Sequence, residues 1–250
     1  MEWLTGVHSV LEALRASRRE LRRLEIRPGR QDRGELAEIR RLAEERKLPV
    51  AELRSKGSGR DENQGVRLEA GALPELDLEP LLAEARGESP WLIALDGVED
   101  PHNVGAVARV AEACGCSGLL LTRRHAPPLT PAVSRASAGA IEHLPVGRVP
   151  NLKRALEALR EHGYWSIGAD AEGDSLYGMD ARSWEGPLVF VLGAEGRGLR
   201  QGVRDAVDFR VGIPMLGQIE SLNVSTAAAV LLFEGVRRAA AVKASGSASD

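Results

Sequence analysis

The sequence is short of cysteine and of long apolar stretches, and both shortages exclude whole classes of protein. Its 250 residues include two cysteines, Cys114 and Cys116, in one C-x-C without a second pair, which is too few for a zinc site or a disulfide framework. No apolar stretch approaches the ~20 residues of a membrane span, and the acidic, polar start MEWLTGVHSVLEAL is unlike a signal peptide. We therefore expect a cytoplasmic protein with no metal site and no membrane partner.

Lysine is scarce as well: 4 of the 33 basic residues are lysine and the other 29 are arginine. Residues 1–70 carry 16 basic and 13 acidic side chains, a balance of +3, and the remaining residues carry 17 and 23, a balance of −6. Arginine suits contacts with phosphates and base edges better than lysine does, so the front of the chain fits an RNA partner. A general bias towards arginine explains the same composition, so charge alone does not decide for RNA.

The first 70 residues have the pattern of a small α/β domain, and 43% hydrophobic content is enough for a folded core. Apolar residues at helical spacing predict helices over 7–16 and 32–47, and short alternating stretches predict strands at 22–27, 49–53 and 66–68. A Gly/Ser-rich loop is expected over 55–65. Residues 71–90 are acidic and contain three prolines, so we interpret them as a linker with room for one helical turn.

From Trp91 onwards, apolar strands alternate with amphipathic helices. Strands are expected at WLIALDG, GLLLT, LPVG, YWSIGAD, PLVFVLG and VDFRVGIP, with helices over 104–114, 130–137 and 151–162 and a long one after Ser221. This alternation predicts a parallel sheet covered by helices on both faces. We place the second domain at 91–240 and expect 241–250 to be a disordered tail.

Three segments of this domain join strand ends to glycines and polar residues: 96–115, 190–199 and 212–234. In a parallel sheet, ligands bind beyond the carboxyl ends of the strands. Each segment alone has an ordinary structural explanation. GAEGRG fits a simple turn, Asn103, Ser221 and Asn223 could be helix N-caps, Arg109 could be a solvated helix residue, and Glu195 could be a loop carboxylate.

Together the three segments resemble the signature motifs of the SpoU (TrmH) family of RNA 2′-O-ribose methyltransferases. The motifs appear in order as D-P-H-N-V-G-A-V-A-R, L-G-A-E-G-R-G-L and I-P-M-x-G-x-I-E-S-L-N-V-S-x-A. The match covers about 91–238 and is nearest to the members that methylate a guanosine of 23S ribosomal RNA. Residues 1–70 resemble the RNA-binding domain of that subgroup, which has a fold like that of ribosomal protein L30e. The usual His-Gln-Gly is Asn63-Gln64-Gly65 in this chain.

The resemblance implies an α/β fold of the SPOUT type, whose last third forms a deep trefoil knot, and a homodimer. It implies S-adenosyl-L-methionine (AdoMet) as methyl donor. The family's AdoMet contacts correspond to Leu192, Gly193, Gly196, Ile213, Met215 and Leu222, and its catalytic set corresponds to Asn103, Arg109, Glu195, Ser221 and Asn223.

The chemistry of these residues leaves one question open, namely which group removes the ribose proton. A guanidinium holds its proton too tightly for Arg109 to be an easy base, so positioning the RNA is the safer assignment for it. Asn103 and Asn223 can hold the ribose or Arg109, and Glu195 can accept a hydrogen bond from either.

Three alternatives remain: the same chemistry on transfer RNA, a non-catalytic RNA-binding or ribosome-assembly protein, and a nicotinamide dehydrogenase. This chain has no early G-x-G-x-x-G, the motif that a dehydrogenase would carry, so the sequence disfavours the third alternative.

Overall fold

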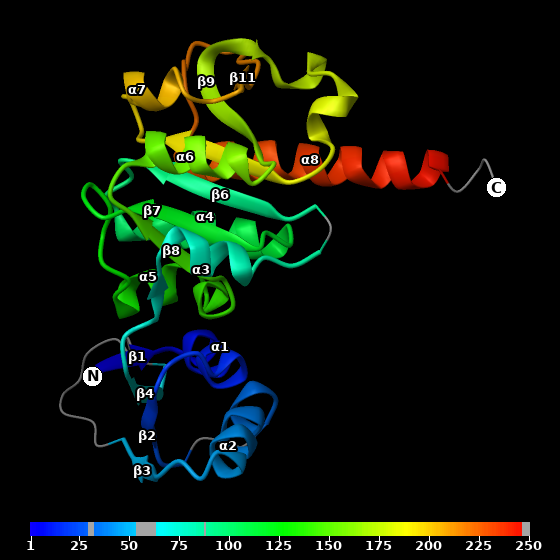
Figure 1. Cartoon of the computed structure of the whole chain (residues 1–250). Coiled ribbons are helices and arrows are strands. Elements are labelled where there is room, and N and C mark those ends of the chain that lie inside the picture. The colour runs from blue at the N-terminus through cyan, green and yellow to red at the C-terminus, as the bar shows by residue number, and fades with distance from the viewer. Residues whose placement is uncertain (30–32, 54–63, 88, 247–250) are drawn as a thin grey trace.

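The described residues form two sheets, a small one with a single apolar core and a large one with an apolar core on each face (Figure 1). The structure is a computed structural model that describes residues 1–29, 33–53, 64–87 and 89–246. Within this part of the chain, no helix has both the length and the apolar character needed to span a membrane.

The small domain is a four-stranded sheet covered on one face by two helices. The strand order is β1 (Glu2–Thr5), β4 (Val66–Ala70), β2 (Leu21–Ile26), β3 (Val50–Glu52), with β4 antiparallel to both neighbours and β3 parallel to β2. Helices α1 (Val7–Ala16) and α2 (Glu35–Glu45) pack together over it. Their predicted apolar faces form the core, with Leu11, Leu14 and Ile39 almost fully buried.

The predicted elements of this domain are confirmed, but strand β1 was not predicted. EWLT becomes a strand because it pairs with residues more than 60 positions away in β4, and no local pattern reports such a partner. Helix α2 begins at Glu35, while Asp32 and most of the expected 55–65 loop lie outside the described residues.

The large domain is a seven-stranded sheet in which every pair of neighbours is parallel, as the alternation of strands and helices predicts. The order is β11 (Phe209–Gly212), β9 (Trp165–Ser175), β10 (Leu188–Gly193), β6 (Trp91–Asp96), β7 (Gly118–Thr122), β8 (Val146–Val149), β5 (Glu75–Leu76). The α-helices are α3 (Leu78–Ala83), α4 (Pro101–Ala113), α5 (Pro131–Ala136), α6 (Leu152–Glu161), α7 (Gln201–Arg204) and α8 (Val224–Gly246). Short 3₁₀ turns are η1 (Ala140–Glu142), η2 (Leu176–Gly178) and η3 (Ala181–Trp184).

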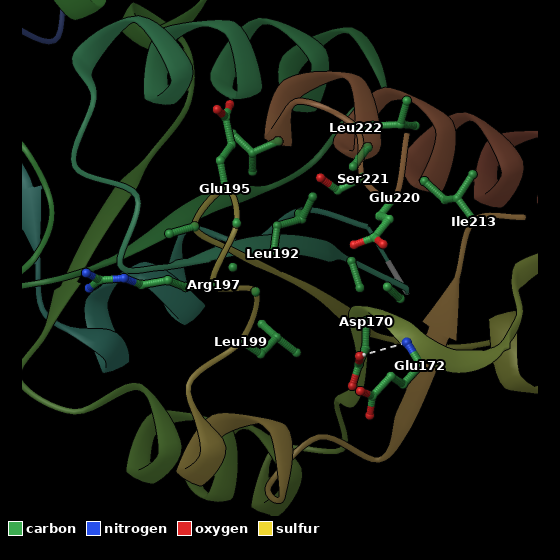
Figure 2. A pocket seen from close by; sticks show the side chains of 18 of the residues that line it. Asp170, Glu172, Leu192, Glu195, Arg197, Leu199, Ile213, Glu220, Ser221 and Leu222 are labelled. Carbon is green, nitrogen blue, oxygen red and sulfur yellow. Dashed lines mark hydrogen bonds between the residues drawn. The ribbon is translucent and has the colours of Figure 1, made fainter. Parts of the chain in front are cut away.

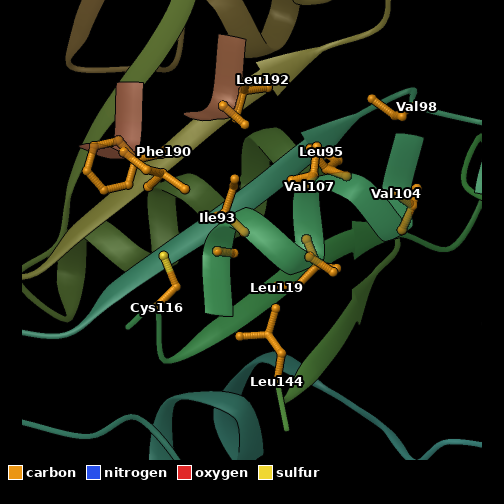
Figure 3. Close-up of a cluster of buried hydrophobic side chains, with 14 of the residues drawn as sticks. Ile93, Leu95, Val98, Val104, Val107, Cys116, Leu119, Leu144, Phe190 and Leu192 are labelled. Atoms are coloured by element: carbon orange, nitrogen blue, oxygen red, sulfur yellow. The ribbon is translucent and has the colours of Figure 1, made fainter. Parts of the chain in front are cut away.

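Side chains of the central strands alternate between two cores, because successive strand residues point to opposite faces. Ile93, Leu95 and Phe190 join the core under α4, α5 and α8 (Figure 3). Leu92 and Val191 join the core under α3, α6 and α7. The two layers of helices hold the carboxyl ends of the strands at one edge of the sheet.

The expected linker differs from the structure over much of its length. Strand β5 pairs with β8 at the sheet edge, and Leu81 of α3 is fully buried against the large domain. The acidic side chains and prolines between the leucines favoured a linker in the sequence analysis, so this short amphipathic segment was not predicted. The C-terminal boundary differs too, since α8 continues through 241–246 to Gly246, where we expected a disordered tail. Residues 247–250 lie outside the described part.

Candidate active site

A cavity of about 510 Å³ opens at the carboxyl ends of β9, β10 and β11, beside the start of α8 (Figure 2). The cavity is lined by all six residues that the family resemblance predicts to contact AdoMet: Leu192, Gly193, Gly196, Ile213, Met215 and Leu222. Glu195 and Ser221 of the predicted catalytic set line it as well. The second and third motifs therefore meet around one cavity, although 13 residues separate the end of one from the start of the other in the chain.

The loop after β10 needs its glycines, so it is more specialised than a simple turn. A Cβ on Gly193 would lie 2.0 Å from the carbonyl carbon of Gly198, because the loop folds back on itself there. Gly196 and Gly198 have φ angles of 73° and 63°, in the left-handed region that favours glycine. The folded loop exposes backbone to the cavity, where a ligand can approach closely.

An ion pair between a buried carboxylate and a half-exposed arginine anchors the end of this loop to the neighbouring strand. Asp96, at the end of β6, accepts hydrogen bonds from the backbone N–H of Arg200 (2.8 Å) and from its Nε (2.7 Å). Because the Asp96 side chain is fully buried, its charge needs this partner. The sequence places Asp96 at a strand end but does not reveal its partner.

Three side chains from the three motifs form a hydrogen-bonded cluster at the rim of the cavity. The amide Nδ2 of Asn103, on α4, donates to Oε1 of Glu195 at 3.0 Å. Asn223 donates from its Nδ2 to Oδ1 of Asn103 at 3.0 Å and to the same Glu195 oxygen at 2.5 Å. Both amides thus orient the carboxylate, and Glu195 itself is exposed to solvent.

The helix-cap explanations of these residues have different outcomes. For α4 the N-cap is Asp100, whose side chain accepts from the His102 N–H, so capping does not explain Asn103. Asn223 does cap α8: its Oδ1 accepts from the backbone N–H of Ser225 at 2.9 Å. Asn223 therefore holds the helix with its oxygen and Glu195 with its nitrogen. Ser221 lies two residues before this cap and lines the cavity.

Arg109 is the one residue of the catalytic set that neither joins the cluster nor lines the cavity. It is exposed on α4. Among the described residues it has no hydrogen-bond or ion-pair partner.

Some cavity residues were missed by the sequence analysis. Asp170 and Glu172, near the end of β9, both form ion pairs with Arg204 of α7. Their position at a strand end was the available signal. Arg197 also lines the cavity, and Figure 2 shows its side chain extending away from the other labelled residues.

Neither cysteine lines the cavity. Burial raises the pKa of Cys114 to about 11 and that of Cys116 to about 12, so both thiols stay protonated at neutral pH. The described residues contain no cluster of three or more His, Cys, Asp or Glu side chains placed to hold a metal ion.

In the small domain, Gln64 of the N-Q-G-V segment has a structural task. Its Oε1 accepts from the backbone N–H of Val7 at 3.1 Å, in the first turn of α1. Helix α1 has glycine as N-cap and no side-chain cap of its own, so Gln64 supplies the missing acceptor. Asn63 lies outside the described residues.

The fold and the site define an α/β protein that binds a small molecule at the carboxyl edge of a parallel sheet. Residues 90–233 match the model of the SpoU rRNA Methylase family, and residues 3–75 match a model described as RNA 2′-O ribose methyltransferase substrate binding. The chain therefore belongs to the SpoU rRNA methylase family, which confirms the resemblance and counts against a nicotinamide dehydrogenase.

Individual relatives agree with this assignment. The chain is 39% identical to the 23S rRNA (guanosine-2′-O-)-methyltransferase RlmB of Ralstonia nicotianae, over 96% of this chain and 97% of the relative. It is 41% identical to the putative TrmH family tRNA/rRNA methyltransferase YacO of Bacillus subtilis, over 71% of each chain. The crystal structure of the SpoU methyltransferase AviRb of Streptomyces viridochromogenes in complex with AdoMet is similar at a TM-score of 0.75 and 25% identity, covering 94% of this chain and 89% of that one.

Proposed function

We propose that this protein transfers a methyl group from AdoMet to the ribose 2′-OH of a guanosine in 23S ribosomal RNA. The observation that carries the proposal is the meeting of the three motifs at one place, with the Asn103–Glu195–Asn223 cluster at the rim of the cavity. The RlmB relative from Ralstonia aligns with the chain almost from end to end, which favours the ribosomal guanosine as target.

The cavity suits AdoMet in size and in lining. Its volume of about 510 Å³ lies within the range of small-molecule sites. Leu192, Ile213 and Leu222 offer apolar surface, and the glycine loop offers backbone donors and acceptors. When bound, AdoMet supplies an electrophilic methyl group, and the AviRb structure contains this cofactor in a related protein.

The remaining task of the chain is to orient the 2′-OH for attack on the methyl group. Both Asn amides donate to Oε1 of Glu195, so its other oxygen, Oε2, is available to accept a hydrogen bond from the substrate. Such positioning lowers the barrier because the reacting groups meet without a further loss of freedom. Arg109 in our proposal binds the RNA phosphate near the target ribose, a contact that suits the guanidinium group.

We further propose a homodimer in which Arg109 of one chain serves the cavity of the other. On α8, the apolar stripe of Ala229, Phe233 and Val236 is not core, since Phe233 is 51% exposed and the other two are half-buried. Near the cavity, Leu216 and Ile219 are 100% and 70% exposed. Apolar surface of this extent favours a protein partner. The trefoil knot of the last third and a cytoplasmic location belong to the same proposal.

The small domain is proposed as the reader of the RNA. Its match to a substrate-binding model and its excess of arginine support this role. Transfer RNA is a second candidate, because the relative YacO is named for both RNA classes.

The decisive experiment measures AdoMet binding by calorimetry and maps 2′-O-methyl groups in RNA from cells with and without the gene. We expect AdoMet binding and the loss of one 23S rRNA methyl group when the gene is absent. A missing methyl group in transfer RNA alone would favour the second candidate. Intact methylation of both RNA classes, together with AdoMet binding, would favour a non-catalytic RNA-binding protein.

A further inference from the structure

The small domain meets the large one at a buried ion pair. Arg19 lies between α1 and β2, and Glu142 ends η1, 123 positions later. Their side chains are each 1% exposed. Arg19 Nε donates to Oε2 of Glu142 at 2.7 Å and its Nη2 donates to Oε1 at 2.9 Å. The pair is therefore bidentate, which fixes direction as well as distance.

The remaining polar groups of this pair are also satisfied. Arg19 Nη1 donates to Oε1 of Glu2 (2.5 Å) and to the carbonyl of Gly71 (3.0 Å). Ser134 donates its hydroxyl to Oε1 of Glu142 at 2.8 Å. Gly71 begins the short connection between β4 and β5. Arg19 therefore binds both Glu142 of the large domain and the segment that joins the two domains, where a hinge motion would take place.

Further contacts surround the ion pair. Arg18 donates to the carbonyl of Leu144 at 2.8 Å, and His143 contacts Glu12 at 2.6 Å. Gly139 packs so closely against α1 that a Cβ there would lie 2.6 Å from Cβ of Glu12. Figure 1 shows α1 on the side of the small domain that faces the large domain.

A packed path leads from this surface to the active site. Glu142 and Ser134 belong to η1 and α5, and both elements pack on α4. At the α4–α5 contact, a Cβ on Gly105 would lie 2.5 Å from Cβ of Ala136. Helix α4 also carries Asn103 of the rim cluster and Arg109.

From these contacts we propose that Arg19 and Glu142 are positioning residues, whose ion pair holds the small domain at one orientation and so determines which nucleotide reaches the active site. The inference rests on the proposed function. A rigid connection keeps the distance between the RNA-reading domain and the methyl-transfer site constant, so that only a ribose at a matching distance along the folded RNA is presented. A flexible connection would admit many riboses.

The test uses the physics of buried charge. Removing one partner leaves a buried charge without its bidentate counter-charge, with the carboxylate of Glu2 left beside Arg19 or the Ser134 hydroxyl left beside Glu142. This is strongly unfavourable, whereas replacing both partners by apolar side chains is often tolerated. We therefore expect Arg19→Met and Glu142→Gln to separate the domains, since separation returns the remaining charge to water. The double variant Arg19→Met/Glu142→Met should dock again. Arg41→Met, which removes an exposed ion pair with Glu45 in the same domain, is the matched control.

The distance between the domains is measured in full-length chains with spin labels at Glu44→Cys and Arg154→Cys, two exposed positions in α2 and α6. The native thiols have raised pKa values and react slowly. We expect one narrow distance distribution in the wild type, the control and the double variant, and a broad one in both single variants.

The functional readouts are AdoMet affinity, kcat/KM on a 23S rRNA fragment, and the pattern of methylated riboses. The single variants should bind AdoMet normally, lose about tenfold or more in kcat/KM and methylate additional riboses, while the double variant recovers. Two results overturn the proposal: a distance distribution that stays narrow in the single variants, or one that broadens without a change in the methylated riboses. Loss of AdoMet binding in the single variants also overturns it, because that loss indicates a merely structural role for the ion pair. A wild type that methylates no RNA would instead refute the proposed function, whatever the distances show.

Discussion

At the residue scale, Asn223 combines the cap of α8 with the hydrogen bonds of the rim cluster, where we propose a catalytic task for it. Its oxygen caps α8 and its nitrogen donates to Glu195 and Asn103. An amide can do both because it has a donor and an acceptor on one planar group. A serine at the same position retains a capping oxygen but has no nitrogen that could reach Glu195.

This difference separates the two tasks by mutation. Asn223→Ser should leave the free energy of unfolding nearly unchanged, because serine is as good an N-cap as asparagine, whereas Asn223→Ala should lose about 1 kcal/mol. Both should slow single-turnover methyl transfer about 100-fold, the usual scale for losing a positioned group. Urea unfolding and rapid-quench methylation measure the two effects. A serine variant with a normal rate would reduce Asn223 to a cap.

Much of the site could be predicted from the sequence, because the motif residues are nearly consecutive and two of the four asparagines of the chain lie beside glycines in these motifs. All six expected cofactor residues line the cavity. The partners were not predictable: the pairing of Asp96 with Arg200 or of Arg204 with Asp170 depends on which loops meet. The catalytic role of Arg109 stays a prediction, because Arg109 is not among the residues that line the cavity.

At the element scale, strand–helix alternation predicted the parallel sheet, while the segment before Trp91 was misjudged. Leu81 of α3 fills a space that two glycines leave: a Cβ on Gly118 or Gly147 would each lie 2.8 Å from a methyl group of Leu81. The complementarity joins three separate parts of the chain. Periodicity within one short segment carries no information about it.

A truncation series tests this assignment. A chain beginning at Ala72 should fold and bind AdoMet, because it keeps β5 and α3, while one beginning at Ser89 loses Leu81 and should be less stable by at least the ~2–5 kcal/mol of a buried leucine. Leu81→Ala in the full chain is the control for the packing term and should cost a similar amount. Calorimetric AdoMet titration and urea unfolding give both quantities. Equal stability of the two truncated chains would show that α3 is a dispensable linker after all.

Helix α8 is attached to the η2–η3 segment through a charge cluster that responds to pH. Glu234 is 7% exposed in its side chain and accepts from Arg237 and Arg238, and the hydrogen bonds from these arginines lower its pKa from 4.5 to about 2. Arg238 in turn donates to the carbonyls of Met179 and Tyr177. The cluster thus links the helix to residues that follow β9.

The sign of the pH effect follows from the lowered pKa. A carboxyl whose pKa is lower in the folded state stabilises the fold above pH 4.5, and this contribution is lost as pH falls from 4.5 towards 2. Glu234→Gln should therefore destabilise the protein by about 1.5–3 kcal/mol at pH 7, with a difference from wild type that shrinks as the solution is acidified through that window. Glu161→Gln, at an exposed position of α6, should show little change. Urea unfolding at several pH values would contradict the cluster's role if the difference stayed constant.

At the scale of the whole molecule, the single chain brings all six expected cofactor residues to one cavity but does not bring Arg109 there. Asn103, Glu195 and Asn223 are joined by hydrogen bonds, while Arg109 is exposed on α4 and apart from them. Helix α4 packs against α8, which also carries the exposed Phe233. In the proposed dimer, a second copy binds over these helices and brings its own Arg109 to the rim cluster. This arrangement would account for the position of Arg109.

Mixing two inactive variants decides whether Arg109 acts across the dimer. Arg109→Ala and Glu195→Gln should each lower single-turnover methylation about 100-fold as pure proteins, with AdoMet binding kept by Arg109→Ala. In a mixed dimer with a shared site, one site combines the intact Glu195 of the first chain with the intact Arg109 of the second, and the other site lacks both. After subunit exchange at equal concentrations, half the dimers are mixed and half their sites are intact, so about a quarter of wild-type activity should return. If Arg109 serves its own chain, every site in the mixture lacks one residue and activity stays at the level of the pure variants.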